Sequence, residues 1–130
     1  MKIKLEQLVA IADFPNANGE MSQGSLSKLL SKELPIKTAY TLGKLFIKIK
    51  SELQQYYQYR DNLIKKYGKE ENGKYSIESS NENFEEFKKG HIELLSIPVD
   101  INFEPLELES LGDIKLSAMD MGNLEMFFKT

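Results

Sequence analysis

A run of side chains at heptad spacing constrains the fold more than any other feature of this chain. Between Pro35 and Gly68, steps of four and three residues alternate. This period places the whole run on one face of an α-helix. Pro35 suits a helix start and Gly68 a helix end. We therefore predict one long central helix over about 36–67, whose seam is Leu42, Phe46, Ile49, Leu53, Tyr56, Arg60, Leu63 and Tyr67.

Such a helix is roughly 45 Å long at 1.5 Å per residue, which exceeds the width of a domain of 130 residues. A second apolar set lies off the seam, so one partner helix is not enough to cover it. Heptads do not distinguish a helical hairpin within one chain from a coiled coil between copies. A homo-oligomer through the central helix therefore stays open. The off-seam set is Leu45, Ile47, Tyr57, Tyr59 and Ile64.

Two features of this helix point to contacts beyond a simple core. Tyr56, Tyr57 and Tyr59 fall within four positions and cannot all face one core, and Arg60 occupies a seam position. Either the stem of Arg60 packs while its guanidinium reaches solvent or a glutamate, or Arg60 and the tyrosines form a partner-binding patch, since both types anchor interfaces. Gly43 costs a helix about 1 kcal/mol relative to Ala, which indicates close approach of a neighbouring segment.

Shorter helices are expected on both sides of the central one. Leu8 to Ala12 has helical spacing, and Ser25 and Ser117 stand where helix caps are expected. Ser79 and Glu82 have capping-box spacing, and the apolar residues that follow recur at helical intervals. We expect that helix, 81–95, to be long enough to pair antiparallel with the central helix.

Alternating apolar residues predict a small, mostly antiparallel sheet. The clearest strand is 97–103, and shorter ones are expected near Ile3 and Leu5 and over 114–116. Asn72–Gly73 predicts a tight turn followed by a short strand, whereas 16–24 has the composition of a loop. The fold class is therefore α+β, predominantly helical, in a single domain over residues 1–130.

The end of the chain has two interpretations. Met121 belongs to a methionine-rich helix that continues into Phe127 and Phe128. Methionines with aromatics adapt readily to partner surfaces, so these three residues are candidates for partner binding. The alternative is a segment that packs on the core of its own chain.

Charge and composition exclude several classes of protein. Residues 1–69 hold 12 basic against 6 acidic side chains, whereas 70–130 hold 5 against 14. We expect the halves to fold onto each other, and the net charge of −3 argues against a dedicated DNA-binding domain. No apolar run approaches the roughly 20 residues of a membrane helix. The start of the chain lacks the apolar core of a secretory signal, so we expect a cytoplasmic protein.

No residue pattern indicates catalysis. The chain has no cysteine, and the acidic residues are spread over turns and helix faces. His91, the only histidine, lies on an apolar helical stripe and is expected to be structural. Phosphate-binding glycine loops and nucleophile elbows are missing. We predict no enzyme activity, no catalytic or cofactor-binding residues, no cofactor and no metal site.

Several segments together carry a family resemblance. They are Leu34–Tyr40, Lys65–Glu70, Val99–Leu106 and Leu111–Ser117, with Lys2–Leu5 at the start. The chain resembles a family of small bacteriophage and prophage proteins of Gram-positive bacteria that is classed as a domain of unknown function. The loop over 16–24 departs from that pattern. The resemblance implies a phage-encoded accessory protein in the bacterial host cytoplasm.

Three functions are expected in descending order. The first is protein–protein binding that modulates or inhibits a host defence or regulatory protein. The second is a structural or assembly role in the virion, where a long helix joins a symmetric oligomer of phage proteins. The third, less favoured, is nucleic-acid binding through the lysines of residues 28–69, which would give strongly salt-dependent retention on DNA.

Overall fold

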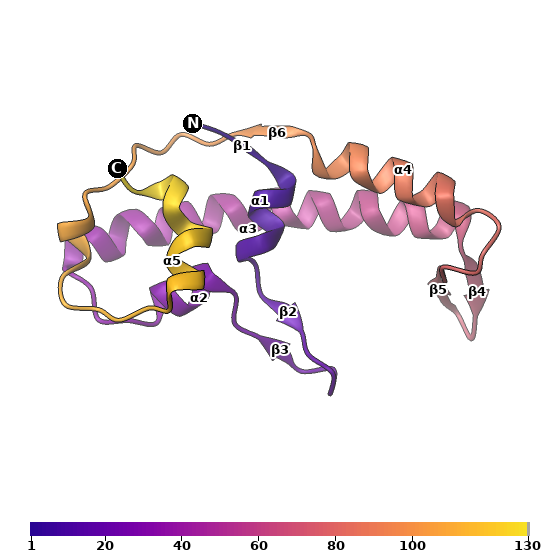
Figure 1. Cartoon of the computed structure of the whole chain (residues 1–130), viewed down its shortest axis with the longest axis horizontal. Coiled ribbons are helices and arrows are strands. Elements are labelled where there is room, and N and C mark those ends of the chain that lie inside the picture. Colours follow the sequence, from indigo (N-terminus) through magenta and orange to yellow (C-terminus); the bar gives the residue numbers. More distant parts are fainter. Residues whose placement is uncertain (130) are drawn as a thin grey trace.

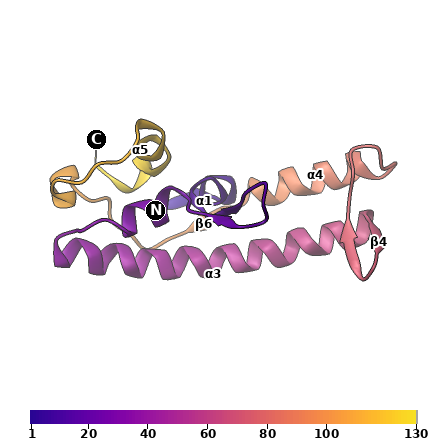
Figure 2. The same ribbon diagram turned by 90° about the horizontal axis from the view of Figure 1, so that it is seen from below.

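One helix of 32 residues, α3 (Ile36–Tyr67), runs the length of the molecule. The computed structural model describes residues 1–129. Most of the remaining chain lies along one side of α3, and the opposite side of the helix is bare over most of its length (Figures 1 and 2). The long central helix predicted from the heptads is confirmed, with the predicted bounds.

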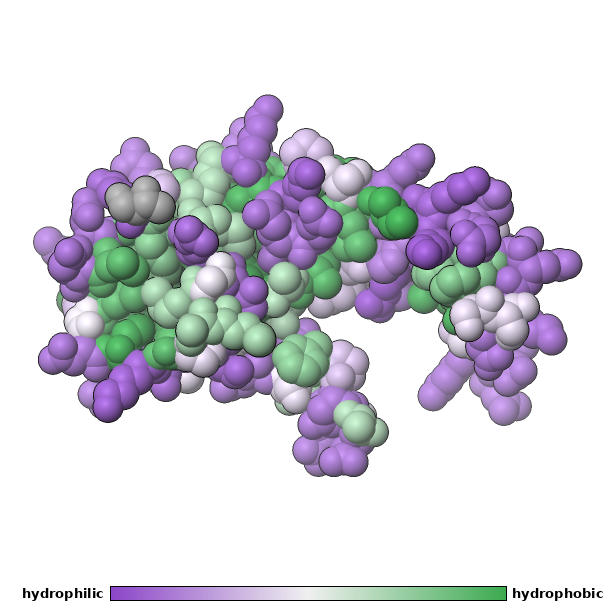
Figure 3. Space-filling model, in the orientation of Figure 1, coloured by the Kyte–Doolittle hydropathy of each residue, from purple (hydrophilic) through white to green (hydrophobic). Residues whose placement is uncertain are grey.

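The first half of α3 carries the main body of the protein. Two short helices pack on it, α1 (Leu5–Ile11) and α2 (Ser25–Leu30), and a third, α5 (Ala118–Leu124), packs on these two. A 3₁₀ turn, η2 (Glu125–Phe127), continues α5. Apolar side chains gather over this body, whereas the far end of the molecule is mostly hydrophilic (Figure 3). The most deeply buried side chains are Leu8, Ile11, Leu29, Leu42, Ile49, Ile101, Leu124 and Phe127.

The second half of α3 is covered by a single antiparallel helix, α4 (Phe84–Leu95) (Figure 1). Leu53 and Tyr56 of α3 are buried, and Leu94 of α4 is buried with them. Together with the main body, α4 buries Leu42, Ile49, Leu53 and Tyr56 of the heptad seam, whereas the other four seam residues, Phe46, Arg60, Leu63 and Tyr67, stay half-buried. The antiparallel pairing predicted for the second long helix is therefore confirmed.

A two-stranded antiparallel sheet joins the start of the chain to the segment after α4. Strand β1 (Lys2–Lys4) pairs with β6 (Pro98–Asp100), with Ile3 opposite Val99. Both of these side chains are buried, because alternation along a strand turns every second residue to the same face. After β6 the chain runs through a 3₁₀ turn, η1 (Leu108–Leu111), toward α5.

Two hairpins project from this framework. The first, β2 (Phe14–Pro15) with β3 (Met21–Ser22), extends away from the main body, and the second, β4 (Lys69–Glu71) with β5 (Lys74–Ser76), follows the end of α3 (Figure 1). The fold is thus α+β and mostly helical, with small antiparallel sheets, as predicted.

Several local predictions are wrong. No neighbouring segment within residues 1–129 approaches Gly43, where an added Cβ would meet nothing within 4 Å, and the strand expected over 97–103 spans only Pro98–Asp100. Residues 114–116 are not a strand, although Ile114 and Leu116 are half-buried against the core. Ser25 is not a cap: Gly24 holds that position, and the Ser25 hydroxyl bonds Asp120. Helix α4 begins at Phe84 rather than near 81, because the Asn81 side chain accepts from the backbone N–H of Asn83 in a turn before it.

Candidate partner-binding surfaces

The tyrosine cluster of α3 is centred on a contact with α4. The Tyr56 hydroxyl lies 2.7 Å from Nε2 of His91, and the His91 ring stacks on Phe87 at 5.6 Å. Burial raises the pKa of Tyr56, and burial followed by the Arg60 charge lowers the pKa of His91. A neutral imidazole and a protonated phenol therefore meet here. The contact fastens two helices together, and the Tyr56 side chain is only 4% exposed.

Arg60 lies beside this cluster and is half-exposed. Its guanidinium is centred 4.9 Å from the Tyr57 ring and 6.0 Å from the Tyr56 ring. It also pairs with Asp61 at 3.2 Å. This arrangement agrees with the first interpretation of Arg60, in which the stem packs and the guanidinium reaches a carboxylate. The carboxylate belongs to Asp61 and not to a glutamate.

The predicted patch of three tyrosines is divided between different surfaces. Tyr57 lines a groove that also contains Met21, whereas Tyr59 and the buried Tyr56 line a hollow beside β6. Because Tyr57 and Tyr59 are two residues apart on a helix, they point to different sides. Tyr59 is well exposed. The structure therefore does not bring Tyr56, Tyr57 and Tyr59 together as one surface.

The groove beside Tyr57 is open to solvent and has a mainly apolar lining. It has a volume of about 340 Å³ and lies between α3, the end of α1 and the β2–β3 hairpin. Met21, on the hairpin, lies at its edge and is 67% exposed. Asp13 and Lys50 are the charged residues in its lining. The remaining lining residues are Ile11, Ala12, Leu26, Ser27, Phe46, Ile49, Leu53 and Gln54.

A second apolar surface lies on the bare side of α3. Ile36, Tyr40 and Ile47 are 85%, 69% and 70% exposed. Gly43 lies among them, and a Cβ atom added there would meet nothing within 4 Å. We call these four residues the outer stripe. Sequence reasoning noted Ile47 and Gly43 separately but missed the stripe, although its spacing of four, three and four residues repeats that of the seam.

The candidate residues at the end of the chain belong to the core. Phe127 and Phe128 are buried, and Met121 is half-buried against the same cluster. Phe103 packs edge-on against Phe127, with ring centres 5.7 Å apart. Of the two interpretations offered for this segment, the structure has the one in which it packs on its own chain.

A buried polar network holds α5 against α2. Asp120 accepts hydrogen bonds from the hydroxyls of Ser25 at 2.7 Å and Ser117 at 2.9 Å, and Lys28 lies 3.5 Å from it. These bonds, with the Lys28 charge, lower the pKa of Asp120. The Ser117 hydroxyl also accepts from the Asp120 N–H, so the predicted cap is confirmed. Within the described residues no buried side-chain N or O atom lacks a hydrogen-bond partner, so this network needs no external ligand.

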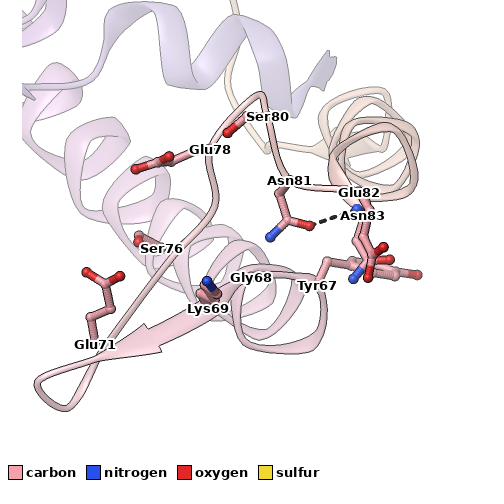
Figure 4. A pocket seen from close by; sticks show the side chains of 10 residues that line it. All are labelled: Tyr67, Gly68, Lys69, Glu71, Ser76, Glu78, Ser80, Asn81, Glu82 and Asn83. Atoms are coloured by element: carbon pink, nitrogen blue, oxygen red, sulfur yellow. Dashed lines mark hydrogen bonds between the residues drawn. The ribbon is translucent and has the colours of Figure 1, made fainter.

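The end of the molecule near β4 and β5 carries a polar hollow of about 500 Å³ (Figure 4). Glu71, Glu78 and Glu82 contribute carboxylates to its lining, but from separate segments. Within residues 1–129, no three His, Cys, Asp or Glu side chains converge as metal ligands would. In the same part of the chain, no helix combines the length and hydrophobicity that crossing a bilayer requires.

Comparison with known proteins adds no relative to this description: no family model, curated protein or solved structure matches the chain.

Proposed function

We propose that this chain is a phage-encoded, non-enzymatic accessory protein that acts in the bacterial host cytoplasm. It binds a host protein, of a defence or regulatory class, and modulates or inhibits it. The phage origin rests on the resemblance of five sequence segments to small phage and prophage proteins. The mode of action rests on the surface of the molecule.

The groove under the β2–β3 hairpin is the observation that carries this proposal. Its lining is mainly apolar, and Met21 stands exposed at its edge on a projecting hairpin. An exposed apolar surface of this kind marks interaction sites. Methionine adds an adaptable, polarisable contact that suits a partner surface. The ligand we propose is an apolar segment of the host protein that inserts beside Phe46 and Tyr57.

The covered seam also favours this function. Leu42, Ile49 and Leu53 are buried by elements of the same chain. These heptad positions therefore do not need a helix from another molecule to cover them. A self-contained chain with a free groove suits a protein that binds an unrelated target.

The test compares capture of host proteins by two variants with matched chemistry. Met21→Asp places a charge at the groove edge, and Met119→Asp places the same charge at another exposed methionine, on α5. Tagged wild-type protein and both variants are incubated with lysate of a Gram-positive host at high salt. We expect wild type and Met119→Asp to retain the same host protein and Met21→Asp to lose it. Equal retention by all three would reject the groove as the binding site.

The alternative function is a structural or assembly component of the virion. The bare side of α3 favours it, because a long uncovered helix face suits packing between copies in a symmetric assembly (Figure 2). The two functions are separated by repeating the capture with lysate from infected cells, alongside light scattering of the purified protein. A closed oligomer that retains nothing from uninfected cells but captures phage proteins from infected ones would replace the host-binding proposal.

A further inference from the structure

The outer stripe is an apolar surface that the rest of the chain leaves uncovered. Ile36, Tyr40 and Ile47 lie on the side of α3 opposite the buried Leu42 and Ile49. Beyond Ile47, that side of the helix carries Ser51, Gln54 and Gln58, which are all exposed and polar. The apolar surface is therefore confined to about three turns of helix. Its position is not explained by packing within the chain.

Two copies of the outer stripe match each other when their helices run in opposite directions. Its residues are separated by four, three and four positions, so reading it backwards gives the same spacing. If two copies of α3 lie antiparallel, Ile36 of one faces Ile47 of the other. Tyr40 then faces Gly43, twice, about a twofold axis. The largest side chain of the stripe thus meets the only position without a side chain.

Gly43 supplies the observation that points outside the chain. Glycine weakens a helix interior, and the backbone around Gly43 is ordinary α-helix. Among the described residues 1–129, no heavy atom lies within 4 Å of where its Cβ would be, beyond its own neighbours in the helix. Packing within the chain therefore does not require a glycine here. A bulky side chain from another molecule could pack closely on this position, and an antiparallel copy provides Tyr40 at that height.

We propose that two copies of this protein associate through the outer stripes of α3, antiparallel and about a twofold axis, with each Tyr40 ring packed on Gly43 of the other copy. Such an interface is isologous and closes at a dimer. A contact of about three turns is at the small end of specific interfaces, so we expect roughly micromolar association.

Charge at the edges of the stripe sets the salt dependence. Lys37, Lys44 and Lys48 lie along one edge, and the twofold axis brings this edge beside its copy. Like charges on neighbouring helix positions weaken association modestly, and salt screens them. The dimer is therefore expected to tighten as ionic strength rises. An acidic partner helix on the same lysines would instead be released by salt.

This inference goes beyond the proposed function and does not depend on it. The hairpin groove and the outer stripe share no residue. If no host protein is captured, the dimer proposal is unaffected. If the protein is monomeric, the groove is still available to a host target.

The first experiment measures the solution mass against concentration for the full chain and two variants. Gly43→Gln puts a long side chain where Tyr40 must pack, and Gly122→Gln makes the same change on α5, where a Cβ also meets nothing within 4 Å. We expect wild type and Gly122→Gln to form dimers that tighten with salt, and Gly43→Gln to dissociate about tenfold more readily, since overpacking a fitted contact disrupts it. A chain that stays monomeric to roughly millimolar concentration, or that dissociates as salt rises, would overturn the proposal.

The second experiment fixes the orientation of the two helices. The chain has no cysteine, so Ile36→Cys and Ile47→Cys proteins can be oxidised separately or mixed. Antiparallel packing predicts that only the mixture forms disulfide-linked dimers, because each position faces the other and not itself. Cross-linking of Ile36→Cys with its own copy would indicate parallel helices and reject the model.

Discussion

The Tyr56 hydroxyl and Nε2 of His91 lie 2.7 Å apart and join the middle of α3 to α4. The imidazole also stacks with the Phe87 ring at 5.6 Å and with the Tyr56 ring at 6.0 Å. Because burial and Arg60 lower the pKa of His91 while burial raises that of Tyr56, the phenol donates and the neutral imidazole accepts. Protonating His91 would remove the acceptor from this bond.

Stability is therefore expected to fall as His91 becomes protonated. The pKa of His91 in the folded protein lies below its ordinary value of about 6.5, so the unfolded chain takes up the proton first as pH decreases. The free energy of unfolding should have its full value above about pH 6.5 and should decrease as the pH falls toward the pKa of His91 in the folded protein. Urea unfolding across this window measures the effect. His91→Gln should remove the slope, since the chain has no other histidine; an unchanged slope would contradict the assignment.

Replacing Asp120 with Asn should weaken the contact between α2 and α5. The carboxylate accepts from Ser25 and Ser117 and lies near Lys28, and losing charge-assisted bonds at a buried site costs about 1–3 kcal/mol. Since the folded pKa of Asp120 is lowered, its contribution is present above the ordinary value of about 3.9 and lost as pH falls through the folded pKa.

Chemical denaturation at neutral and acidic pH tests this prediction. Asp120→Asn should lower the midpoint at neutral pH and lose part of the acid sensitivity of wild type. Asp113→Asn, at an exposed position, is the matched control and should leave both unchanged. Equal effects of the two variants would show that the buried network does not contribute.

The features predicted correctly depend on short stretches of sequence. The heptads determine α3, Asn72–Gly73 determines the turn between β4 and β5, and Ser117 caps α5. The strand predicted over 114–116 did not form: its alternating residues do face the core, but its backbone has no neighbouring strand to bond. Alternating apolar residues indicate which side of a segment is buried. Whether that segment forms a strand depends on whether the rest of the fold places another strand beside it.

The candidate surfaces were harder to predict than the helices. The groove exists because the loop expected over 16–24 folds as a hairpin that stands beside Phe46 and Tyr57. Its composition does not reveal that position. The outer stripe was readable in principle, since Ile36, Tyr40 and Ile47 have helical spacing. Recognising it requires knowing that α1, α2 and α4 all pack on the other side of α3.

The β4–β5 hairpin should depend on its two turn residues. Asn72 and Gly73 both have positive φ, 53° and 78°, as the two-residue turns that match strand twist require. Gly73→Ala should destabilise the turn by about 1 kcal/mol, because a Cβ disfavours this conformation. Hydrogen exchange of the amides in β4 and β5 should accelerate while exchange in α3 is unchanged. Acceleration throughout the chain would mean that the hairpin is coupled to global stability.

Replacing three glycines with alanine should change the stability of the protein in different directions, because the surroundings of the three positions differ. At Gly43 an added Cβ meets nothing within 4 Å in its own chain, so in protein dilute enough to be monomeric Ala should stabilise the chain by about 0.5–1 kcal/mol through helix propensity. At Gly90 the Cβ would lie 3.1 Å from Leu63 Cδ2, which should offset most of that gain. At Gly24 it would lie 2.3 Å from the carbonyl oxygens of Ile11 and Ala12, so the backbone must shift and stability should fall by about 1–3 kcal/mol. Thermal unfolding of the three variants measures this order, and a destabilising Gly43→Ala would mean that the bare side of α3 is already in contact with another molecule.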